Sequence, residues 1–384
     1  MNIEFFSRGV IEIIDRNSLE SKIQSGKKLR VKLGVDPTSP DIHLGHTVAL
    51  RKMKELQEEG HQIVFLIGDY TTKIGDPSGR SKTRPMLTDE EIETNAKTYL
   101  DQVGKILDVD KSEIRRNSEW FSKMSFNDLL QLLSKFTVAQ IMERDDFSNR
   151  TKSGIDISIH EIIYPIMQAY DSVTLKADLE MGGTDQRFNL LAGRHLQKKI
   201  GQTPQEIMMM KLLVGLDGKE KMSKSLGNYV GITESPPVMF GKIMSIPDSL
   251  LKDYFELCTD FPEAAVGAEM SKGPREAKES LALEIVKIYH SAEAAESAKN
   301  SFIDQFKNKE TPENIPEVEL TGTFKIPLFL INIGAVAGSS EAYRLIEQGG
   351  VKIDGAKITD PFSDITTKPG MIIQVGKLKY YKIK

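Results

Sequence analysis

The sequence predicts an α/β protein in which a mostly parallel sheet is wrapped by helices, followed by a helical domain and a small α+β module. Three observations support this prediction. Apolar runs of strand length alternate with segments of helical period up to about residue 230, a pattern rich in Ala, Glu, Lys and Leu follows from about residue 247, and short strand-like runs return after residue 324. The 384 residues leave room for two or three domains, each with its own core.

The first 230 residues alternate strands and helices as expected for a parallel sheet. The predicted strands cover residues 29–35, 62–68 and 173–179. The first predicted helix covers residues 43–59, the second opens with the capping-box pair Thr88 and Glu91, and the third runs from after residue 179 to Lys199. Sheets of this kind bind ligands at the carboxyl ends of their strands. We therefore expect the chemistry in the loops after Val35, Gly68 and Leu179.

Changes in composition divide the chain into four predicted parts. These are a first domain at 1–246, a helical domain at 247–307, a polar linker with two prolines at 308–323 and a C-terminal module at 324–384. The module contains a predicted helix over residues 339–346 and predicted strands over residues 351–353 and 371–375. It carries nine Lys or Arg against five Asp or Glu, whereas the whole chain has a net charge of −4. Counted alone, this asymmetry is more typical of a solvated surface than of an RNA site.

Composition excludes several classes of protein. Apolar residues make up 39% of the chain and charged residues 28%, the balance of a globular protein and not of a disordered one. No stretch approaches the roughly 20 apolar residues of a membrane span, and the first residues do not form a signal peptide, so we expect a cytoplasmic protein without membrane contact. The single Cys258 and six histidines predict no disulfide and no structural metal site, so any metal should arrive with a substrate.

The first chemical signal is a histidine pair at the start of the helix predicted after residue 43. His43 and His46 are three positions apart, with Gly45 between them, and they follow a strand that ends near Asp36. A helix start already favours phosphate through its free amides and dipole, and Gly45 admits close approach. The pattern indicates an anion site. A metal pair or two incidental surface histidines remain the alternatives for an isolated motif of this type.

The second signal is a loop rich in lysine and serine at residues 215–228. Three lysines in six positions are flanked by glycines, and the loop also carries Met222 and Ser223. Such a loop can close positive charge over a polyphosphate, with Lys221 and Lys224 as the expected charges. A solvated loop is the alternative when the cluster is considered alone.

Taken together, the two segments resemble the HxGH and KMSKS signatures of class I aminoacyl-tRNA synthetases, in the same chain order. The residues between them are similar to the amino-acid pocket of bacterial tyrosyl-tRNA synthetases, and the similarity covers essentially the whole chain. The segments that carry it are residues 33–38, 75–79, 164–171 and 182–189.

The resemblance implies a Rossmann-like catalytic domain that activates L-tyrosine with ATP, releases pyrophosphate, and transfers tyrosine to the 3′ end of tRNA(Tyr). It also implies Mg²⁺ that enters with ATP, a homodimer whose tRNA crosses both subunits, and a C-terminal module that binds RNA. The carboxylate of an amino acid is already ionised, so the first reaction needs no activated serine, cysteine or general base. Positioning and stabilisation of phosphate charge should carry the catalysis.

The resemblance also implies roles for individual residues. Asp76, Tyr164 and Gln168 would hold the tyrosine ammonium, Asp171 would accept a hydrogen bond from the phenol, and Gln186 would lie near the reacting carboxylate. Asp36 would also belong to the tyrosine site. The implied ATP site contains His43 and His46 with Lys221 and Lys224 as catalytic groups, Asp185 at the ribose, and Thr38, Gly45, Met222 and Ser223. The residue types agree with this chemistry, because a zwitterionic amino acid needs acidic and amide acceptors, and Tyr164 and Gln168 are spaced to share one helix face.

Two departures separate this chain from many bacterial members. Lys32 stands where they have a tyrosine that helps hold the substrate hydroxyl, and Arg187 and Phe188 replace a common Trp-Gly pair. No role is assigned to Lys32. The competing interpretations are a tryptophanyl-tRNA synthetase, which Asp171 and the C-terminal module disfavour, and a non-catalytic RNA-binding homologue, which the intact histidines and lysines disfavour.

Overall fold

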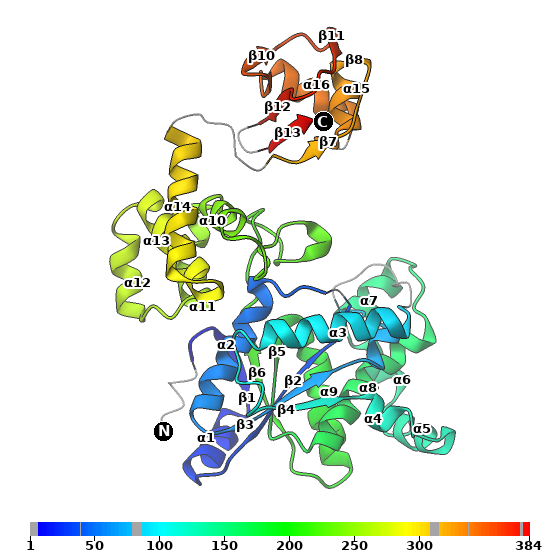
Figure 1. Cartoon of the computed structure of the whole chain (residues 1–384). Coiled ribbons are helices and arrows are strands. Elements are labelled where there is room, and N and C mark those ends of the chain that lie inside the picture. Colours follow the sequence, from blue (N-terminus) through cyan, green and yellow to red (C-terminus); the bar gives the residue numbers. More distant parts are fainter. Residues whose placement is uncertain (1–6, 39, 79–86, 308–314, 337, 377–378) are drawn as a thin grey trace. The chain divides into compact units, whose positions relative to one another are not determined.

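The computed structural model describes residues 7–38, 40–78, 87–307, 315–336, 338–376 and 379–384, with the backbone alone for residues 305–307. The chain divides into two compact units, residues 1–299 and 300–384 (Figure 1). Across the described residues, no helix combines the length and apolar character needed to cross a membrane.

A six-stranded sheet forms the centre of the first unit. Its strands lie in the order β1 (Val10–Ile14), β6 (Glu206–Met210), β5 (Leu179–Gly183), β2 (Arg30–Val35), β3 (Gln62–Ile67) and β4 (Glu113–Arg116). All neighbouring pairs are parallel except β1 with β6. The order places β2 and β5 side by side at the middle of the sheet, so the loops after these two strands meet at one edge.

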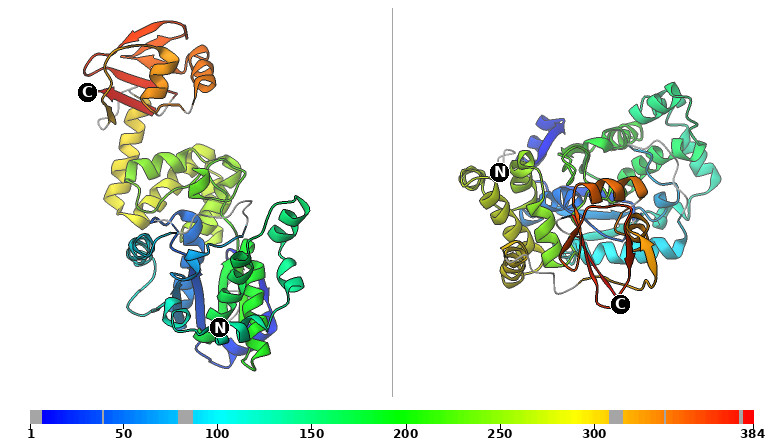
Figure 2. Two further views of the ribbon diagram at one scale, coloured as in Figure 1. Left: turned by 90° about the vertical axis from the view of Figure 1, so that its right-hand side faces the viewer. Right: turned by 90° about the horizontal axis from the view of Figure 1, so that it is seen from above.

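Helices cover both faces of this sheet. Figure 2 shows α2 and α3 on one side and α8 and α9 on the other. The elements that accompany the sheet are α1 (Arg16–Gln24), α2 (Leu44–Glu58), η2 (Thr71–Lys73), α3 (Asp89–Val103), α4 (Ser118–Phe121), α5 (Phe126–Leu133), α6 (Val138–Met142), α7 (Asp145–Lys152), α8 (Ile159–Leu175), η3 (Thr184–Gln186), α9 (Arg187–Lys199) and η4 (Lys224–Leu226). The predicted strands at 29–35 and 62–68 and the predicted helix at 43–59 are confirmed as β2, β3 and α2.

Local sequence explains how several of these elements begin. Thr88 caps α3, because its hydroxyl accepts from the Glu91 amide at 3.2 Å and the Glu91 carboxylate accepts from the Thr88 amide at 2.8 Å. β3 has five buried residues in a row, which is the pattern of a strand covered on both faces. The predicted fold class, α/β with a parallel sheet, is confirmed.

The predicted strand at residues 173–179 is wrong. Residues 173–175 complete the 17-residue helix α8, Lys176 ends it in a left-handed conformation with φ of 49°, and β5 starts at Leu179. The apolar run in this segment is the buried stripe of α8, and Val173 packs with Ile166 and Ala169 of the same helix. β1, β4 and β6 were not predicted.

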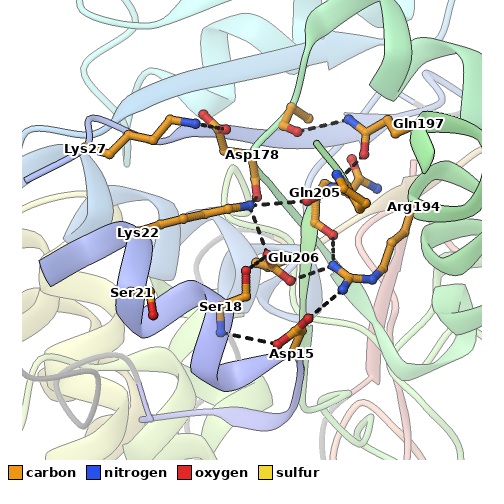
Figure 3. Close-up of polar contacts among 12 residues, drawn as sticks. Asp15, Ser18, Ser21, Lys22, Lys27, Asp178, Arg194, Gln197, Gln205 and Glu206 are labelled. Carbon is orange, nitrogen blue, oxygen red and sulfur yellow. Dashed lines mark hydrogen bonds and ion pairs between the residues drawn. The ribbon is translucent and has the colours of Figure 1, made fainter. Parts of the chain in front are cut away.

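A polar network lies at the amino-terminal ends of the strands, around the first residue of β6 (Figure 3). The carboxylate of Glu206, which is 1% exposed, accepts from Ser18 Oγ at 2.6 Å and pairs with Lys22 Nζ at 2.9 Å and Arg194 Nη1 at 2.6 Å. These contacts join α1, α9 and β6. The network therefore fixes the end of the sheet opposite the strand ends where ligands bind.

Helices continue the first unit after the sheet. They are α10 (Pro236–Met244), η5 (Asp248–Leu250), α11 (Leu251–Cys258), α12 (Glu263–Met270), α13 (Pro274–Tyr289) and the first residues of α14 (Ala292–Lys307), whose residues after 299 belong to the second unit. The Arg8 guanidinium donates to the carbonyls of Phe255, Glu256 and Thr259 at 2.7 to 3.1 Å, which ties this helical part to the start of the chain. These helices make up most of residues 247–299, which pack in one unit with the sheet, and the separate helical domain at 247–307 stays a prediction.

The second unit is a small α+β module. Its five-stranded sheet has the order β10 (Ala356–Ile358), β9 (Val351–Ile353), β12 (Ile372–Val375), β13 (Lys379–Ile383) and β7 (Glu317–Val318), and a two-stranded sheet pairs β11 (Asp364–Thr366) with β8 (Thr323–Lys325). Helices α15 (Ile326–Asn332) and α16 (Ser339–Glu347) complete its core with Phe329, Leu330 and Ile346. The predicted helix and both predicted strands are present. Residues 308–314 of the predicted linker and residues 377–378 of the C-terminal module lie outside the described part, and the bounds of the four predicted parts stay predictions.

Candidate active site

A cavity of about 680 Å³ lies where the carboxyl ends of β2 and β5 meet. Of the residues that the sequence predicts for the site, Lys224 does not line it. Those that line it are Asp36, Thr38, His43, Gly45, His46, Asp76, Tyr164, Gln168, Asp171, Asp185, Gln186, Lys221, Met222 and Ser223. The two signature segments and the segments between them, which are far apart in sequence, therefore share one cavity.

The histidine pair lies at the start of α2. His43 precedes the first helical residue, and its ring centroid is 3.8 Å from that of His46. A Cβ on Gly45 would lie 3.0 Å from two ring atoms of His43, so the pair needs glycine between them. Burial lowers the pKa of His43 to about 2 and that of His46 to about 4, with the Lys224 ammonium acting in the same direction. Both imidazoles are therefore neutral at pH 7, and the Nδ1 of His46 accepts from the His43 backbone amide at 3.3 Å.

The lysine loop approaches the same cavity. Lys221 Nζ lies 2.5 Å from Asp185 Oδ2, and the side chain of Met222 between the two lysines is buried. Asn228 fixes the loop, because its Oδ1 accepts from the Ser223 amide at 2.8 Å. Lys221 thus holds a position at the cavity wall against a carboxylate.

Lys224 has a different setting. Its ammonium pairs with Asp41 Oδ2 at 2.6 Å and lies 5.8 Å from the centre of the Tyr229 ring. It is close enough to lower the pKa of both histidines, although it does not line the cavity. The Lys224 ammonium would have to leave Asp41 to reach a ligand in the cavity.

Acidic and amide side chains gather at the other end of the cavity. Tyr164 donates to Asp36 Oδ2 at 2.9 Å, and Thr71 donates to Asp36 Oδ1 at 2.8 Å. Gln186 Nε2 donates to Asp76 Oδ2 at 2.7 Å. Burial, reinforced by the Asp36 carboxylate, raises the pKa of Tyr164 well above its usual value, so this phenol stays protonated and donates.

Asp171 lies deep in the cavity wall and is 2% exposed. Its carboxylate accepts from Trp120 Nε1 at 2.9 Å and from Asn117 Nδ2 at 3.3 Å. Burial raises its pKa to about 7, against the opposing effects of the Lys32 ammonium and these two donors. The two donors orient the carboxylate, and its pKa lies close to neutral pH.

Gln168, Asp76 and Tyr164, the three residues predicted to hold the ammonium, each bond to a different partner. The Gln168 amide donates to Glu180 Oε1 at 3.4 Å, while Tyr164 and Asp76 bond to the groups named above. The three side chains line one cavity from two different segments. They form separate hydrogen-bonded pairs in its wall.

Several residues of the site were not predicted from the sequence. The Arg144 guanidinium, 3% exposed, donates to Asn189 Oδ1 at 2.8 Å and Ser78 Oγ at 3.0 Å, and it lies 3.9 Å from Asp76. It braces the segments that carry Asp76 and Gln186, and no local pattern marks it. Trp120 and Asn117 follow β4 directly, so recognition of that strand would have directed attention to them.

The described residues contain no group of three or more His, Cys, Asp or Glu side chains that could hold a metal ion. The prediction that the protein has no structural metal stays a prediction. The carboxylate of Asp185, which lines the cavity, is paired with Lys221, and that of Asp41 is paired with Lys224.

Comparisons with known proteins identify relatives over nearly the whole chain. Residues 24–307 match the family model for class I tRNA synthetases (W and Y). The tyrosine–tRNA ligase of Moorella thermoacetica is 48% identical over 99% of this chain and 95% of its own length. Those of Dehalococcoides mccartyi and Bordetella avium are 50% and 52% identical, and the matches cover 97% and 94% of those proteins.

Solved structures show the same fold. A truncated mitochondrial tyrosyl-tRNA synthetase of Coccidioides posadasii matches 77% of this chain and 91% of its own with a TM-score of 0.65 at 24% identity. A tyrosyl-tRNA synthetase of Archaeoglobus fulgidus, solved with L-tyrosine, matches 77% of this chain and 98% of its own with a TM-score of 0.63 at 24% identity. At this identity the likeness establishes the fold of the matched region.

Proposed function

We propose that this chain, which belongs to the tyrosine–tRNA ligases of class I, activates L-tyrosine with ATP in the cavity between β2 and β5 and transfers the tyrosyl group to the 3′ end of tRNA(Tyr). The ligase activity follows from family membership, since relatives about half identical in sequence match it from end to end. The observation that carries the assignment of the site is the single cavity lined by both the histidine and the lysine segments.

The proposed first step is attack of the tyrosine carboxylate on the α-phosphorus of ATP. A bond forms between a carboxylate oxygen and phosphorus, the bond to the bridging oxygen of pyrophosphate breaks, and tyrosyl-adenylate remains bound. The neutral imidazoles of His43 and His46 donate hydrogen bonds to phosphate oxygens, and Lys221 and Lys224 neutralise the charge that accumulates on the leaving pyrophosphate. For this, each lysine exchanges its aspartate partner for phosphate.

MgATP is the form of nucleotide that enters as substrate. We assign Asp185 to the ribose and place Thr38, Gly45, Met222 and Ser223 around the nucleotide, since all of them line the cavity on the side of the signature segments. Mg²⁺ bound between phosphates adds positive charge there. The lysines then share the neutralisation of pyrophosphate with the ion.

The amino acid occupies the other end. Asp76, Tyr164 and Gln168 supply oxygen acceptors for the ammonium, with Asp36 beside them and Gln186 near the carboxylate. This set offers acidic and amide oxygens to a cation, which is the chemistry that an ammonium group requires.

Asp171 accepts the phenolic hydroxyl and so distinguishes tyrosine from phenylalanine. It is buried and already bonded to two donors, so a substrate without a hydroxyl leaves part of its acceptor capacity unused. Discrimination of this kind is large because an unpaired buried polar group is costly, and it removes the need for an editing site.

The second step joins tyrosine to tRNA. A ribose hydroxyl at the 3′ end of tRNA(Tyr) attacks the acyl carbon, and AMP leaves. We assign RNA contact to the C-terminal module, where Lys379 and Lys382 flank Tyr380 and Tyr381 in β13 and the excess of basic residues suits phosphate. Aromatic rings there can stack on unpaired bases.

We also propose that the protein acts as a homodimer, with tRNA contacting both subunits, in the cytoplasm. Support for the dimer comes from large apolar side chains that are exposed on neighbouring segments of the first unit. These are Phe126 (74% exposed), Leu130 (50%), Val138 (69%), Ile155 (40%) and Ile159 (77%). Exposed apolar groups of this number in one region are typical of a protein interface.

Exchange of pyrophosphate into ATP tests the proposed function. The purified full chain should catalyse exchange with tyrosine and should show at most a trace of exchange with tryptophan or phenylalanine at equal concentration. Exchange with tryptophan instead would favour the related tryptophanyl activity, and no exchange with any of the three would favour a non-catalytic RNA-binding role.

A further inference from the structure

We propose that the buried ion pair of Lys32 and Glu180 is a specificity-determining and positioning element, which supports the Asp171 carboxylate in its task of selecting the phenol. The proposal rests on the proposed function and deepens it. Lys32 departs from the tyrosine expected at this position, and nothing in its sequence context indicates a role. The surroundings of its ammonium group supply one.

The pair lies at the centre of the sheet. Lys32 on β2 and Glu180 on β5 are direct partners in the parallel register of these strands. Lys32 Nζ is 2.8 Å from Glu180 Oε1, and the two side chains are 0% and 1% exposed. Both line the same cavity as Asp171. A charged pair therefore closes the deep end of the proposed tyrosine pocket.

The pair is bound to the helix that carries Asp171. Lys32 Nζ donates to Ser172 Oγ at 2.8 Å and to the backbone carbonyl of Gln168 at 3.3 Å. Ser172 Oγ donates in turn to Glu180 Oε2 at 2.9 Å. These contacts grip α8 on both sides of Asp171 in the chain. The position of that carboxylate relative to the sheet thus depends on the ion pair.

A second layer holds Glu180 in place. Gln205 Nε2 donates to Glu180 Oε2, and a Cβ on Gly193 would lie 2.7 Å from that same nitrogen, so α9 needs a glycine to pass this close. Figure 3 shows how Gln205 is anchored. Its backbone amide donates to Gln197 Oε1 at 2.6 Å, and its carbonyl accepts from Arg194 at 2.5 Å. The ion pair is thus part of a network that reaches the amino-terminal ends of the strands, where Arg194 also pairs with Glu206.

The two charges of the pair also act on the pKa of Asp171. The titratable and charged groups that act on Asp171 or are acted on by it are Lys32 from β2, Glu180 from β5 and Tyr164 from its own helix, while Asn117 and Trp120 are neutral donors. The ammonium favours the ionised form of Asp171 and the Glu180 carboxylate opposes it, so the two charges have opposite effects. With the pKa of Asp171 at about 7, a small change in either charge alters its ionisation at neutral pH.

Stability alone is a weak reason for this arrangement. Two charges that are removed from water lose solvation that their attraction hardly repays, so a buried pair is often neutral compared with apolar side chains of similar size. The ionised form of Asp171 is the better acceptor for a phenol. The ammonium in this pair favours that form, which gives a functional reason for its place.

The test compares three variants of the full chain, Lys32→Met, Glu180→Gln and the double variant that carries both. Pyrophosphate exchange is measured with tyrosine and with phenylalanine from pH 6 to pH 9, and the ratio of kcat/KM for tyrosine to kcat/KM for phenylalanine is followed.

The wild-type ratio should rise with pH as Asp171 ionises. In Lys32→Met the midpoint should move to higher pH, with a roughly fivefold lower ratio at pH 7 if the shift is about one pH unit, because the ionised fraction of Asp171 then falls from about one half to about one tenth. In Glu180→Gln it should move to lower pH, and the double variant should lie between the two.

A merely structural role would not separate these variants. If all three lose activity with tyrosine while the midpoint stays at its wild-type pH, or if the two single variants shift it in the same direction, the proposal is wrong. Should Lys32→Met fail to fold, the comparison of Glu180→Gln with the double variant still decides, because the midpoint of the double variant must lie at the higher pH.

A matched control is Lys52→Met. Lys52 is also buried, at 2% exposure, and pairs with Glu55 on α2. Its replacement should lower stability and leave the pH midpoint unchanged. Failure of the proposed function itself would look different, because the wild-type protein would then show no exchange that depends on tyrosine.

Discussion

The Asp171 carboxylate accepts from one indole and one amide, and these contacts leave it oriented for a further donor. Replacement by asparagine keeps the size of the side chain and removes its charge. We expect Asp171→Asn to lower kcat/KM for tyrosine by about 10- to 100-fold, because a hydrogen bond to a charged group contributes about 1.5–3 kcal/mol. Phenylalanine makes no such bond, and its kcat/KM should change far less. Pyrophosphate exchange with each amino acid measures this, and equal losses would refute the pocket assignment.

His46 provides a prediction about stability and pH. Its pKa in the folded protein is about 4 because of burial, below the ordinary value of 6.5 for an unperturbed histidine. The unfolded chain therefore binds a proton at this site as the pH falls below about 6.5, whereas the folded chain does not until about pH 4. Folding is thus destabilised with falling pH, by on the order of 1–2 kcal/mol at pH 5.

Urea unfolding at pH 7.5 and pH 5 tests this linkage. The loss of unfolding free energy between the two pH values should be smaller in His46→Gln than in the wild type, by roughly the amount that the titration of His46 contributes. An identical loss in both proteins would show that His46 is protonated in the folded state or solvated there.

The sequence indicated many of the site residues and little of what supports them. His43, His46 and Lys221 belong to short motifs whose chemistry is visible in the residues themselves. Arg144 and Trp120 reach the site across elements that are distant in the chain, so their contacts exist only after folding. Lys32 was noticed as a departure, but the pairing of β2 with β5 was needed to bring it to Glu180.

At the scale of elements, the loop that contains η4 must release its lysines from carboxylates before they reach phosphate. Lys221→Met and Lys224→Met should each slow pyrophosphate exchange by about 10²- to 10³-fold, the usual cost of losing one donor to a transition state. Lys219→Met, an exposed lysine of the same loop, is the matched control and should be nearly silent. If either of the first two variants weakens tRNA binding alone and leaves exchange normal, the role of the loop must be revised.

Hydrophobic pattern predicted β2, α2 and β3 well because each has a clear period and an end signal. It failed at α8, where the last turn is mostly buried and apolar and therefore resembles a strand. It also missed β6, whose five consecutive buried residues include three methionines without β-branching. Burial on all sides removes the contrast that a periodicity argument needs.

For the whole molecule, the C-terminal module offers a prediction about RNA. Replacement of Lys379 and Lys382 by glutamine should weaken binding of tRNA(Tyr) and reduce the slope of log affinity against log salt by about one for each phosphate that the variant no longer neutralises. Pyrophosphate exchange should stay normal. The control is Lys272→Gln in the first unit, which should leave the salt slope unchanged, and unchanged binding by the double variant would argue against RNA contact through β13.

Assembly offers another prediction at this scale. A charge at Phe126, which is 74% exposed on α5, would be buried unpaired if two chains associate through this region. Phe126→Asp should therefore convert a dimer into a monomer in sedimentation velocity. A wild-type protein that sediments as a monomer, or a variant that remains dimeric, would exclude this surface as the interface.

The most direct test of the account is a crystal structure of the full chain with a non-hydrolysable analogue of tyrosyl-adenylate. We predict that the phenolic hydroxyl lies within hydrogen-bond distance of Asp171, with the phosphate between the His43–His46 pair and the loop that carries Lys221. An analogue bound outside this cavity, or bound with its phosphate remote from both segments, would contradict the account.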